Sequence, residues 1–273
     1  MINNPYKLLV VDIDGTLLGR DGTISAEDKE ALAKARNSGI QVSLSTGRVT
    51  HAAMKILNQL SLEGYHVFFD GALVCHPENG EEVYCRPINS ELVRQIIEFA
   101  HLHEIQIELY SATNYFIERE SWSSEVRRKF FGIEPDIVDF NKVWRQERII
   151  KGTLLAASPE EKAKADDFYR YFDSTLSFSW TNTPAYPGVD FINVLDPDVS
   201  KGKALEALVA FLGIDLSEVM AIGDGVNDVS LLSRAGLAVA MGNAPDELNA
   251  VADYVTLDID HSGVAAAVNR FLL

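Results

Sequence analysis

Two aspartates, Asp12 and Asp14, follow a short apolar run near the start of the sequence. The run, Leu8–Val11, is too short for a buried helix and is typical of a parallel strand buried on both faces. Because residues i and i+2 of a strand point the same way, the two carboxylates could share one site at the carboxyl end of the strand, where open α/β sheets bind ligands. Carboxylates this close repel one another unless a cation lies between them or one stays protonated. The pair indicates a divalent metal together with proton transfer, with a solvated Asp-x-Asp turn as the alternative.

Two further segments could bind an anion. Thr46-Gly47 ends a second predicted strand, Ile40–Leu44, and its hydroxyl and backbone N–H groups could hold an anion at a helix N-terminus, although the segment could also be a simple turn. Lys201 lies in the first turn of a helix that Ser200 begins, where its charge opposes the helix dipole. A bound anion would explain the lysine, and a solvated side chain is the alternative.

A fourth segment, Gly-Asp-Gly-Val-Asn-Asp, ends at Asp228 and leads from a strand into a helix. Its glycines would let the backbone approach a ligand, while Asp224 and Asp228 supply hard oxygen ligands suited to Mg²⁺. The segment is not a dinucleotide fingerprint, because Asp228 stands at the third glycine position. The order and spacing of the four segments make a chance arrangement a poor explanation.

The elements that must position these residues alternate at both ends of the chain. Helices near 25–39 and 50–60 separate strands at 40–44 and 67–69 from the first strand, and this βαβαβ alternation predicts a parallel sheet with helices on both faces. After Asp70-Gly71 the alternation is lost. Hairpins and α–β units there indicate an α+β insert with an antiparallel sheet.

The alternation resumes with a helix from Ser200, which leads into further strand–helix pairs. A strand is expected at 219–222, followed by a helix from about Asn227. A second strand is expected at 237–240, followed by a last helix that ends at Leu273. The fold class is therefore α/β, a Rossmann-like doubly wound parallel core with an inserted α+β domain. We expect residues 1–72 and 189–273 to form the core domain and residues 73–188 to form the insert.

The composition limits the classes of partner. A chain of 273 residues favours two domains, and 47% apolar with 23% charged residues is typical of a globular protein. The net charge of −16 argues against a nucleic-acid partner, so that any anion site must be locally positive. Cys75 and Cys85 have no metal-ligand spacing and are expected to be ordinary thiols, although a bond across a hairpin is an alternative. With no signal peptide and no membrane span in the sequence, we expect a cytoplasmic protein that does not bind membranes.

Together these segments resemble the haloacid dehalogenase-like superfamily, in its Cof-like group of phosphatases. The resemblance spans nearly the whole chain. Its motifs are DIDGTLL at 12–18, STGR at 45–48, VSKGKAL at 199–205 and GDGVNDVSLL at 223–232, and the tail AVAMGNAPDELNAVADYV is similar as well. The resemblance implies a phosphatase acting on a small phosphorylated metabolite, such as a sugar or cofactor phosphate, with the insert as a cap that closes over the substrate and selects it.

The resemblance also implies roles for the individual residues. Asp12 would be the nucleophile that forms an aspartyl-phosphate, and Asp14 would be the general acid and then the general base. The phosphate-binding residues would be Thr46, Gly47, Lys201 and Asn227. The Mg²⁺ ligands would be Asp12, the backbone carbonyl of Asp14, Asp224 and, through water, Asp228.

The sequence departs from the family pattern at two places. Asp70-Gly-Ala stands where many relatives have Asn-Gly-Ala, which would change the polarity near the substrate, and His261-Ser-Gly-Val replaces an acidic-Gly-Val segment. Two alternative functions stay open, a phosphomutase of the same superfamily and a non-enzymatic Mg²⁺-dependent phospho-acceptor. Asp14 and the large insert argue against the second, and the oligomeric state is left open. In the cap, Tyr110, Tyr115, Trp122, Lys151 and Tyr186 are expected to be core or surface residues rather than ligand contacts.

Overall fold

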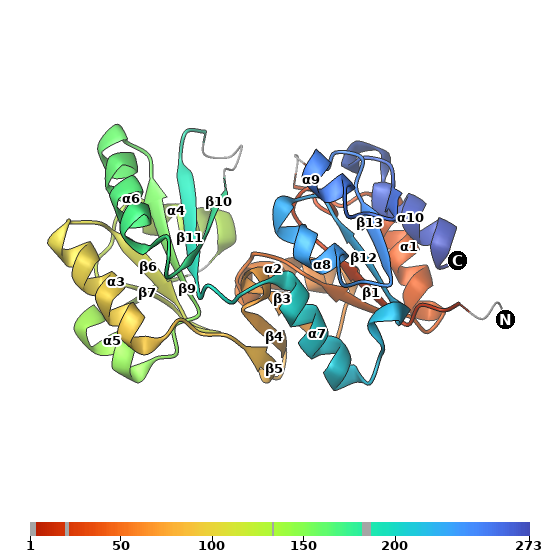
Figure 1. The fold of residues 1–273 in the computed structure, drawn as a ribbon, viewed down its shortest axis with the longest axis horizontal. Coiled ribbons are helices and arrows are strands. Elements are labelled where there is room, and N and C mark those ends of the chain that lie inside the picture. Colours follow the sequence, from red (N-terminus) through yellow and green to blue (C-terminus); the bar gives the residue numbers. More distant parts are fainter. Residues whose placement is uncertain (1–3, 20–21, 133, 182–186) are drawn as a thin grey trace. The chain divides into compact units, whose positions relative to one another are not determined.

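The computed structural model describes residues 4–19, 22–132, 134–181 and 187–273 (Figure 1). The chain forms two compact units. Unit 1 consists of Met1–Arg48, Ala53–Tyr84 and Ser200–Leu273, and unit 2 consists of Val49–Ala52 and Cys85–Val199. Apart from the short segment Val49–Ala52, the chain leaves unit 1 once, builds unit 2, and returns. The domain limits expected from the sequence, at 72/73 and 188/189, stay a prediction.

Unit 1 is built on a parallel sheet with the strand order β14-β13-β12-β1-β2. The strands are β1 Leu8–Val11, β2 Gln41–Leu44, β12 Val219–Gly223, β13 Leu237–Ala240 and β14 Tyr254–Val255. The first strand lies inside the sheet between β12 and β2, and all of its residues are buried, as expected for a strand covered on both faces. The carboxyl ends of β1, β2 and β12 therefore lie at one edge of the sheet.

Helices cover both faces of this sheet, which confirms the doubly wound α/β fold (Figure 1). Their bounds are α1 Ala26–Asn37, α2 Thr50–Leu60, α7 Lys201–Leu212, α8 Val229–Leu232, α9 Asp246–Asn249 and α10 Gly263–Phe271. On one face, α7 and α8 pack their apolar residues against β1, β12 and β13. The helices α1 and α10 lie together, and the backbone N–H of Ala265 donates a 2.7 Å hydrogen bond to the buried carboxylate of Asp28.

The strand predicted at 67–69 does not extend the parallel sheet as expected. Strand β3, His66–Phe68, pairs antiparallel with β4, Leu73–His76, which is followed by β5, Glu81–Cys85, in a separate three-stranded sheet. One parallel bridge, between Ser45 and Val67, connects β3 to the end of β2. The chain reverses directly after β3 in the tight turn Phe69–Gly71, and this reversal allows the antiparallel pairing with β4.

Unit 2 contains a six-stranded sheet with the order β10-β11-β9-β6-β7-β8, antiparallel except for the β7–β8 pair. The strands are β6 Ile107–Tyr110, β7 Tyr115–Ile117, β8 Asp136–Ile137, β9 Lys151–Ala156, β10 Ser177–Thr181 and β11 Asp190–Leu195. The helices are α3 Ser90–Leu102, α4 Trp122–Phe131, α5 Phe140–Gln146 and α6 Pro159–Phe172. Residues of α3, α5 and α6 form one apolar core with the sheet. Trp122 and Val126 of α4 belong to a second, smaller apolar cluster. The expected α+β character of the insert is confirmed.

Sequence patterns predict no elements between 119 and 149, where the structure has α4, β8 and α5. The polar helix α4 contributes mainly Trp122 and Val126 to an apolar cluster, so its apolar periodicity is weak, and α5 has only seven residues. The helix expected from about Asn227 starts later, because the 3-10 turn Val226–Asp228 precedes α8. Cys75 and Cys85 do not form a disulfide. In the part of the chain that the structure describes, no helix is both long enough and apolar enough to cross a membrane.

Candidate active site

Asp12 is the first residue after β1 and lies at the carboxyl edge of the parallel sheet. Its backbone N–H continues the strand ladder with a 3.0 Å hydrogen bond to the carbonyl oxygen of Ile222, the last residue but one of β12. The residue is only 6% exposed. Because its side chain leaves the end of a strand that is fixed on both sides, the carboxylate has a well-defined position inside unit 1.

Lys201 approaches Asp12 from the first turn of α7. Ser200 caps that helix by accepting a hydrogen bond from the N–H of Lys203, as the sequence predicts. The buried ammonium group donates 2.6 Å hydrogen bonds to Asp12 Oδ1 and to Asp228 Oδ1. Burial opposes the charged form, but the charges of Asp12 and Asp228 outweigh it and raise the pKa of Lys201. The lysine therefore stays charged, and ion pairing explains its place in a first turn.

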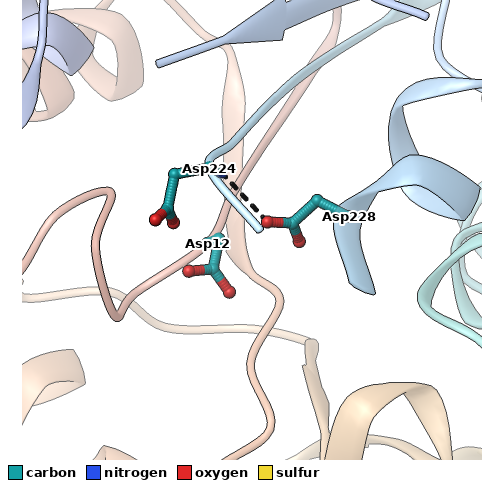
Figure 2. A group of neighbouring side chains, drawn as sticks. All are labelled: Asp12, Asp224 and Asp228. Carbon is teal, nitrogen blue, oxygen red and sulfur yellow. Dashed lines mark hydrogen bonds between the residues drawn. The ribbon is translucent and has the colours of Figure 1, made fainter. Parts of the chain in front are cut away.

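Three carboxylates meet beside this lysine. Asp12, Asp224 and Asp228 each offer one oxygen, and these oxygens all lie within 4.8 Å of one another (Figure 2). Burial raises the pKa of Asp12 well above its usual range although Lys201 acts against it, and burial raises the pKa of Asp224 to about 6. Lys201 supplies one positive charge against three carboxylates, so a divalent cation would balance the cluster. Carboxylate oxygens are the ligands that hard divalent cations prefer, and the donor set fits such an ion.

Asp228 also shapes the loop that carries Asp224. Its Oδ2 accepts a 3.1 Å hydrogen bond from the backbone N–H of Asp224 (Figure 2). The same oxygen accepts a 3.0 Å hydrogen bond from the backbone N–H of Gly225. The loop passes so close to this carboxylate that a Cβ on Gly223 would lie 2.5 Å from Asp228 Cγ. A glycine is therefore required where the backbone approaches the Asp228 carboxylate. Asp228 both holds the loop in place and accepts a hydrogen bond from Lys201.

Asp14 lies apart from the buried cluster, although its charge reaches Asp224. Its side chain is 56% exposed and forms a two-pronged ion pair with Arg48, with Nε–Oδ2 at 2.8 Å and Nη2–Oδ1 at 2.5 Å. The sequence predicts that the carboxylates of Asp12 and Asp14 share one site, but the structure places only the Asp12 carboxylate in the buried cluster.

The predicted phosphate-binding residues of the second motif lie at the end of β2. Thr46 is buried, and its Oγ1 accepts a 3.1 Å hydrogen bond from the backbone N–H of Arg48. Gly47 lies against the carboxylate of Asp70, and Asn227 Nδ2 donates to Asp70 Oδ1 at 3.0 Å. The structure therefore brings residues of all four motifs to one edge of unit 1.

Sequence reasoning missed two residues that hold Asp224 in place. The buried Thr16 donates a 2.8 Å hydrogen bond from its Oγ1 to Asp224 Oδ1. Asn243 donates from Nδ2 to the carbonyl oxygen of Gly15 at 3.0 Å and to Asp224 Oδ2 at 3.4 Å. Thr16 lies inside the first motif and Asn243 inside the tail segment, but only the meeting of the two loops shows what they contact.

The cap residues singled out in the sequence are largely core residues of unit 2. Tyr110 and Tyr115 are buried and donate hydrogen bonds to Glu108 at 2.8 and 2.9 Å. Trp122 Nε1 donates to Glu161 at 3.2 Å, and Lys151 is 6% exposed. Tyr186 lies outside the described residues.

The split parallel core, with acidic side chains at its strand ends and a large insert, defines the class of protein. The family model for haloacid dehalogenase-like hydrolases matches residues 9–268. The chain therefore belongs to the haloacid dehalogenase-like hydrolase family.

Individual relatives indicate which kind of hydrolase the chain is. Phosphatase YwpJ of Bacillus subtilis is 29% identical over 285 residues, covering 97% of this chain and 100% of the relative. In the same organism, 5-amino-6-(5-phospho-D-ribitylamino)uracil phosphatase YcsE is 28% identical, covering 98% of this chain and 96% of the relative. The crystal structure of the sugar phosphatase BT4131, of subclass IIB, matches with a TM-score of 0.78 and 25% identity over 98% of this chain and all of that one. The chain is thus a phosphatase of this family.

Proposed function

We propose that the protein is a Mg²⁺-dependent phosphatase that hydrolyses phosphate monoesters of small metabolites through an aspartyl-phosphate on Asp12. The observation that carries the proposal is the buried Asp12 carboxylate, paired with Lys201 and within 4.8 Å of carboxylate oxygens of Asp224 and Asp228. Phosphoryl transfer requires mainly positioning and positive charge near the non-bridging oxygens. In a chain of net charge −16, such a local cation is a specific feature of the site.

The proposed reaction has two displacements at phosphorus. In the first, an oxygen of Asp12 forms a bond to phosphorus, the bond to the leaving alcohol breaks, and Asp14 supplies the proton that the alcohol takes up. In the second, water attacks the aspartyl-phosphate and gives its proton to Asp14, and the bond between Asp12 and phosphorus breaks with release of inorganic phosphate. In the structure, the Asp14 carboxylate accepts two hydrogen bonds from Arg48. The first step requires a protonated Asp14 that no longer accepts one of the two hydrogen bonds from Arg48.

The remaining residues of the site would bind the phosphoryl group and the metal ion. Thr46, the N–H of Gly47, Lys201 and Asn227 would hold the phosphoryl oxygens. Asp12, Asp224, the backbone carbonyl of Asp14 and, through water, Asp228 would hold Mg²⁺. The ion would neutralise charge on the phosphoryl group and keep Asp12 ionised.

The names of two relatives support the proposed substrate class. YcsE is named for a phosphate ester on a ribityl group, and BT4131 is described as a sugar phosphatase. Both kinds of substrate carry phosphate on a polyol-like alcohol, so we propose sugar phosphates and cofactor phosphates of this kind.

The test is a panel of such esters, with phosphate release measured in Mg²⁺ and in excess EDTA. Asp12→Asn, which keeps the shape but removes the nucleophile, is the matched control. We expect release from a subset of the panel only in Mg²⁺ and only with Asp12 present. Full turnover in EDTA would contradict the metal requirement, and isomerised esters without phosphate release would indicate a mutase.

A further inference from the structure

Asp70 lies in a strained turn directly after β3. Phe69, Asp70 and Gly71 have φ values of 53°, 55° and 100°, so three successive residues adopt left-handed or related conformations. Each such non-glycine residue is strained and persists only where the surroundings hold it. Here the buried ring of Phe69 and the 3.1 Å hydrogen bond from its N–H to the carbonyl of Arg48 hold the turn. The turn fixes the backbone of Asp70, and the hydrogen bond from Asn227 orients its carboxylate.

Asp70 touches the predicted phosphate-binding residues from several sides. Its backbone N–H donates a 3.0 Å hydrogen bond to the carbonyl oxygen of Thr46, and its Oδ1 accepts a 3.0 Å hydrogen bond from Asn227 Nδ2. A Cβ on Gly47 would lie 2.7 Å from Asp70 Oδ1, so the carboxylate packs directly on that backbone. The charge of Asp70 also acts on Lys201. Asp70 therefore influences all four of the predicted phosphate-binding residues.

We propose that Asp70 is a positioning residue of the phosphate-binding pocket: its carboxylate holds the amide of Asn227, and its negative charge weakens the binding of inorganic phosphate. This inference rests on the proposed function, because it takes Thr46, Gly47, Lys201 and Asn227 as the phosphate-binding residues.

The two effects have separate physical causes. An asparagine amide has two N–H donors, and Asp70 accepts one, which orients the other toward an anion. A carboxylate beside a pocket built for anions repels them, so that product phosphate is held less tightly. Asparagine at position 70 would keep the first effect and remove the second.

Two variants separate hydrogen bond from charge. Asp70→Asn keeps an acceptor oxygen for Asn227 and loses the charge, whereas Asp70→Gly loses both, and both residues tolerate the left-handed backbone. The measurement is the dissociation constant of inorganic phosphate with Mg²⁺, by titration calorimetry, alongside KM and kcat for p-nitrophenyl phosphate. We expect D70N to bind phosphate about fivefold more tightly than wild type.

We expect D70G to bind phosphate about tenfold more weakly than D70N, because Asn227 loses its acceptor. In an Asn227→Ala background, this difference between D70G and D70N should disappear. A merely structural role of Asp70 would instead shift thermal stability in every background and leave the D70N dissociation constant at the wild-type value.

Either of two results would overturn the proposal: equal phosphate affinity of D70N and wild type, or a D70G–D70N difference that persists without Asn227. If D70G fails to fold, D70N still decides on the charge, and Asp70→Ser, whose short side chain cannot reach Asn227 as Asp70 does, replaces D70G. Phosphate binding is measured without turnover, so an inactive wild type would refute the proposed function while these affinities still decide on Asp70.

Discussion

Lys201 carries a positive charge into the interior of unit 1, where it contacts two carboxylates. Replacing it by alanine should lower turnover at least about 100-fold, because an electrostatic contact to a developing charge in a closed site is typically worth that much. The lysine also compensates Asp12 and Asp228, so the variant should unfold more easily, by about 3 kcal/mol. Steady-state kinetics and urea unfolding would measure both effects.

Lys203 provides the control for this prediction. It lies in the same turn of α7 but its side chain is exposed, so Lys203→Ala should change neither quantity appreciably. Near-normal turnover of Lys201→Ala would show that the buried ion pairs serve the fold alone.

The sequence could predict which residue types gather at this site, because Asp12, Thr46 and Asp224 each come shortly after a predicted buried strand. It could not predict their partners. The hydrogen bonds of Thr16 and Asn243 to Asp224 depend on which loops meet, and the pairing of Asp14 with Arg48 depends on side-chain conformation. Contacts between segments far apart in the chain leave no local periodicity to read.

The turn after β3 is the element whose geometry departs most from a sequence-based expectation. Gly71 has a φ of 100°, and a Cβ there would lie 2.3 Å from the carbonyl oxygen of Ser200, next to Lys201. Gly71→Ala should therefore destabilise the protein by about 3 kcal/mol or more, since both backbone strain and overlap oppose the methyl group.

Gly80 is a matched control for Gly71. Its φ is 73°, but nothing lies within 4 Å of the position of its Cβ. Gly80→Ala should thus report the strain alone, about 1 kcal/mol. Equal free energies of unfolding for the two variants, from urea titration, would contradict the close packing of the turn on α7.

His66 of β3 gives unit 1 a dependence on pH. The side chain is fully buried, and its Nδ1 accepts a 3.0 Å hydrogen bond from the N–H of Leu44. Burial, with a smaller contribution from His76, lowers the pKa of His66 to about 3, below the value of about 6.5 in an unfolded chain. The unfolded state therefore binds more protons as the pH falls through 6.5, and stability present above that pH is lost toward pH 3.

The predicted loss is about 1.4 kcal/mol per pH unit below 6.5 from this residue. His66→Asn keeps a hydrogen-bond acceptor but cannot titrate. Between pH 7 and pH 5.5, wild type should lose about 1 kcal/mol more free energy of unfolding than the variant. Parallel pH profiles would mean that His66 takes up its proton in the folded protein.

At the scale of the whole molecule, unit 2 is inserted into unit 1. Arg86 on the outgoing segment donates a 2.9 Å hydrogen bond to Asp196 on the returning one, so the two connections lie side by side. Replacing residues 87–195 by a short Gly-Ser linker should leave a folded unit 1 that hydrolyses p-nitrophenyl phosphate but discriminates among metabolite esters by less than about tenfold, since the insert is proposed to select the substrate.

A second deletion tests where unit 1 ends. Removing residues 73–188, the insert expected from the sequence, also removes β4, whose Val74 lies in the apolar core of unit 1. This variant should be insoluble or unfolded, whereas the shorter deletion should give a cooperative unfolding transition. An unchanged substrate ranking in the shorter deletion would contradict the role proposed for unit 2.

The fold class could be predicted because the βα alternation is local and repeated. The limits expected from the sequence put the hairpin β4–β5 in the insert. Its antiparallel pairing with β3 and the packing of Val74 against distant segments leave no local pattern from which its place could be predicted. The helices α4 and α5 could not be found for a different reason, because few of their residues are apolar and buried.

The central claim is that Asp12 carries a phosphoryl group and that Asp14 moves the protons. Asp14→Asn keeps the backbone carbonyl and nearly the same shape, so mainly proton transfer is lost. An alcohol needs a proton to leave, whereas p-nitrophenolate does not, and hydrolysis of the aspartyl-phosphate needs a base with either substrate. The variant should therefore lose sugar-phosphate turnover by at least about 100-fold.

The decisive measurement is rapid-quench kinetics of Asp14→Asn with p-nitrophenyl phosphate, followed by mass spectrometry of the protein. We predict a burst of about one equivalent of nitrophenolate per site, then a stall, with phosphate attached to Asp12. Undiminished steady turnover of both substrates, with no phosphorylated protein, would contradict the account.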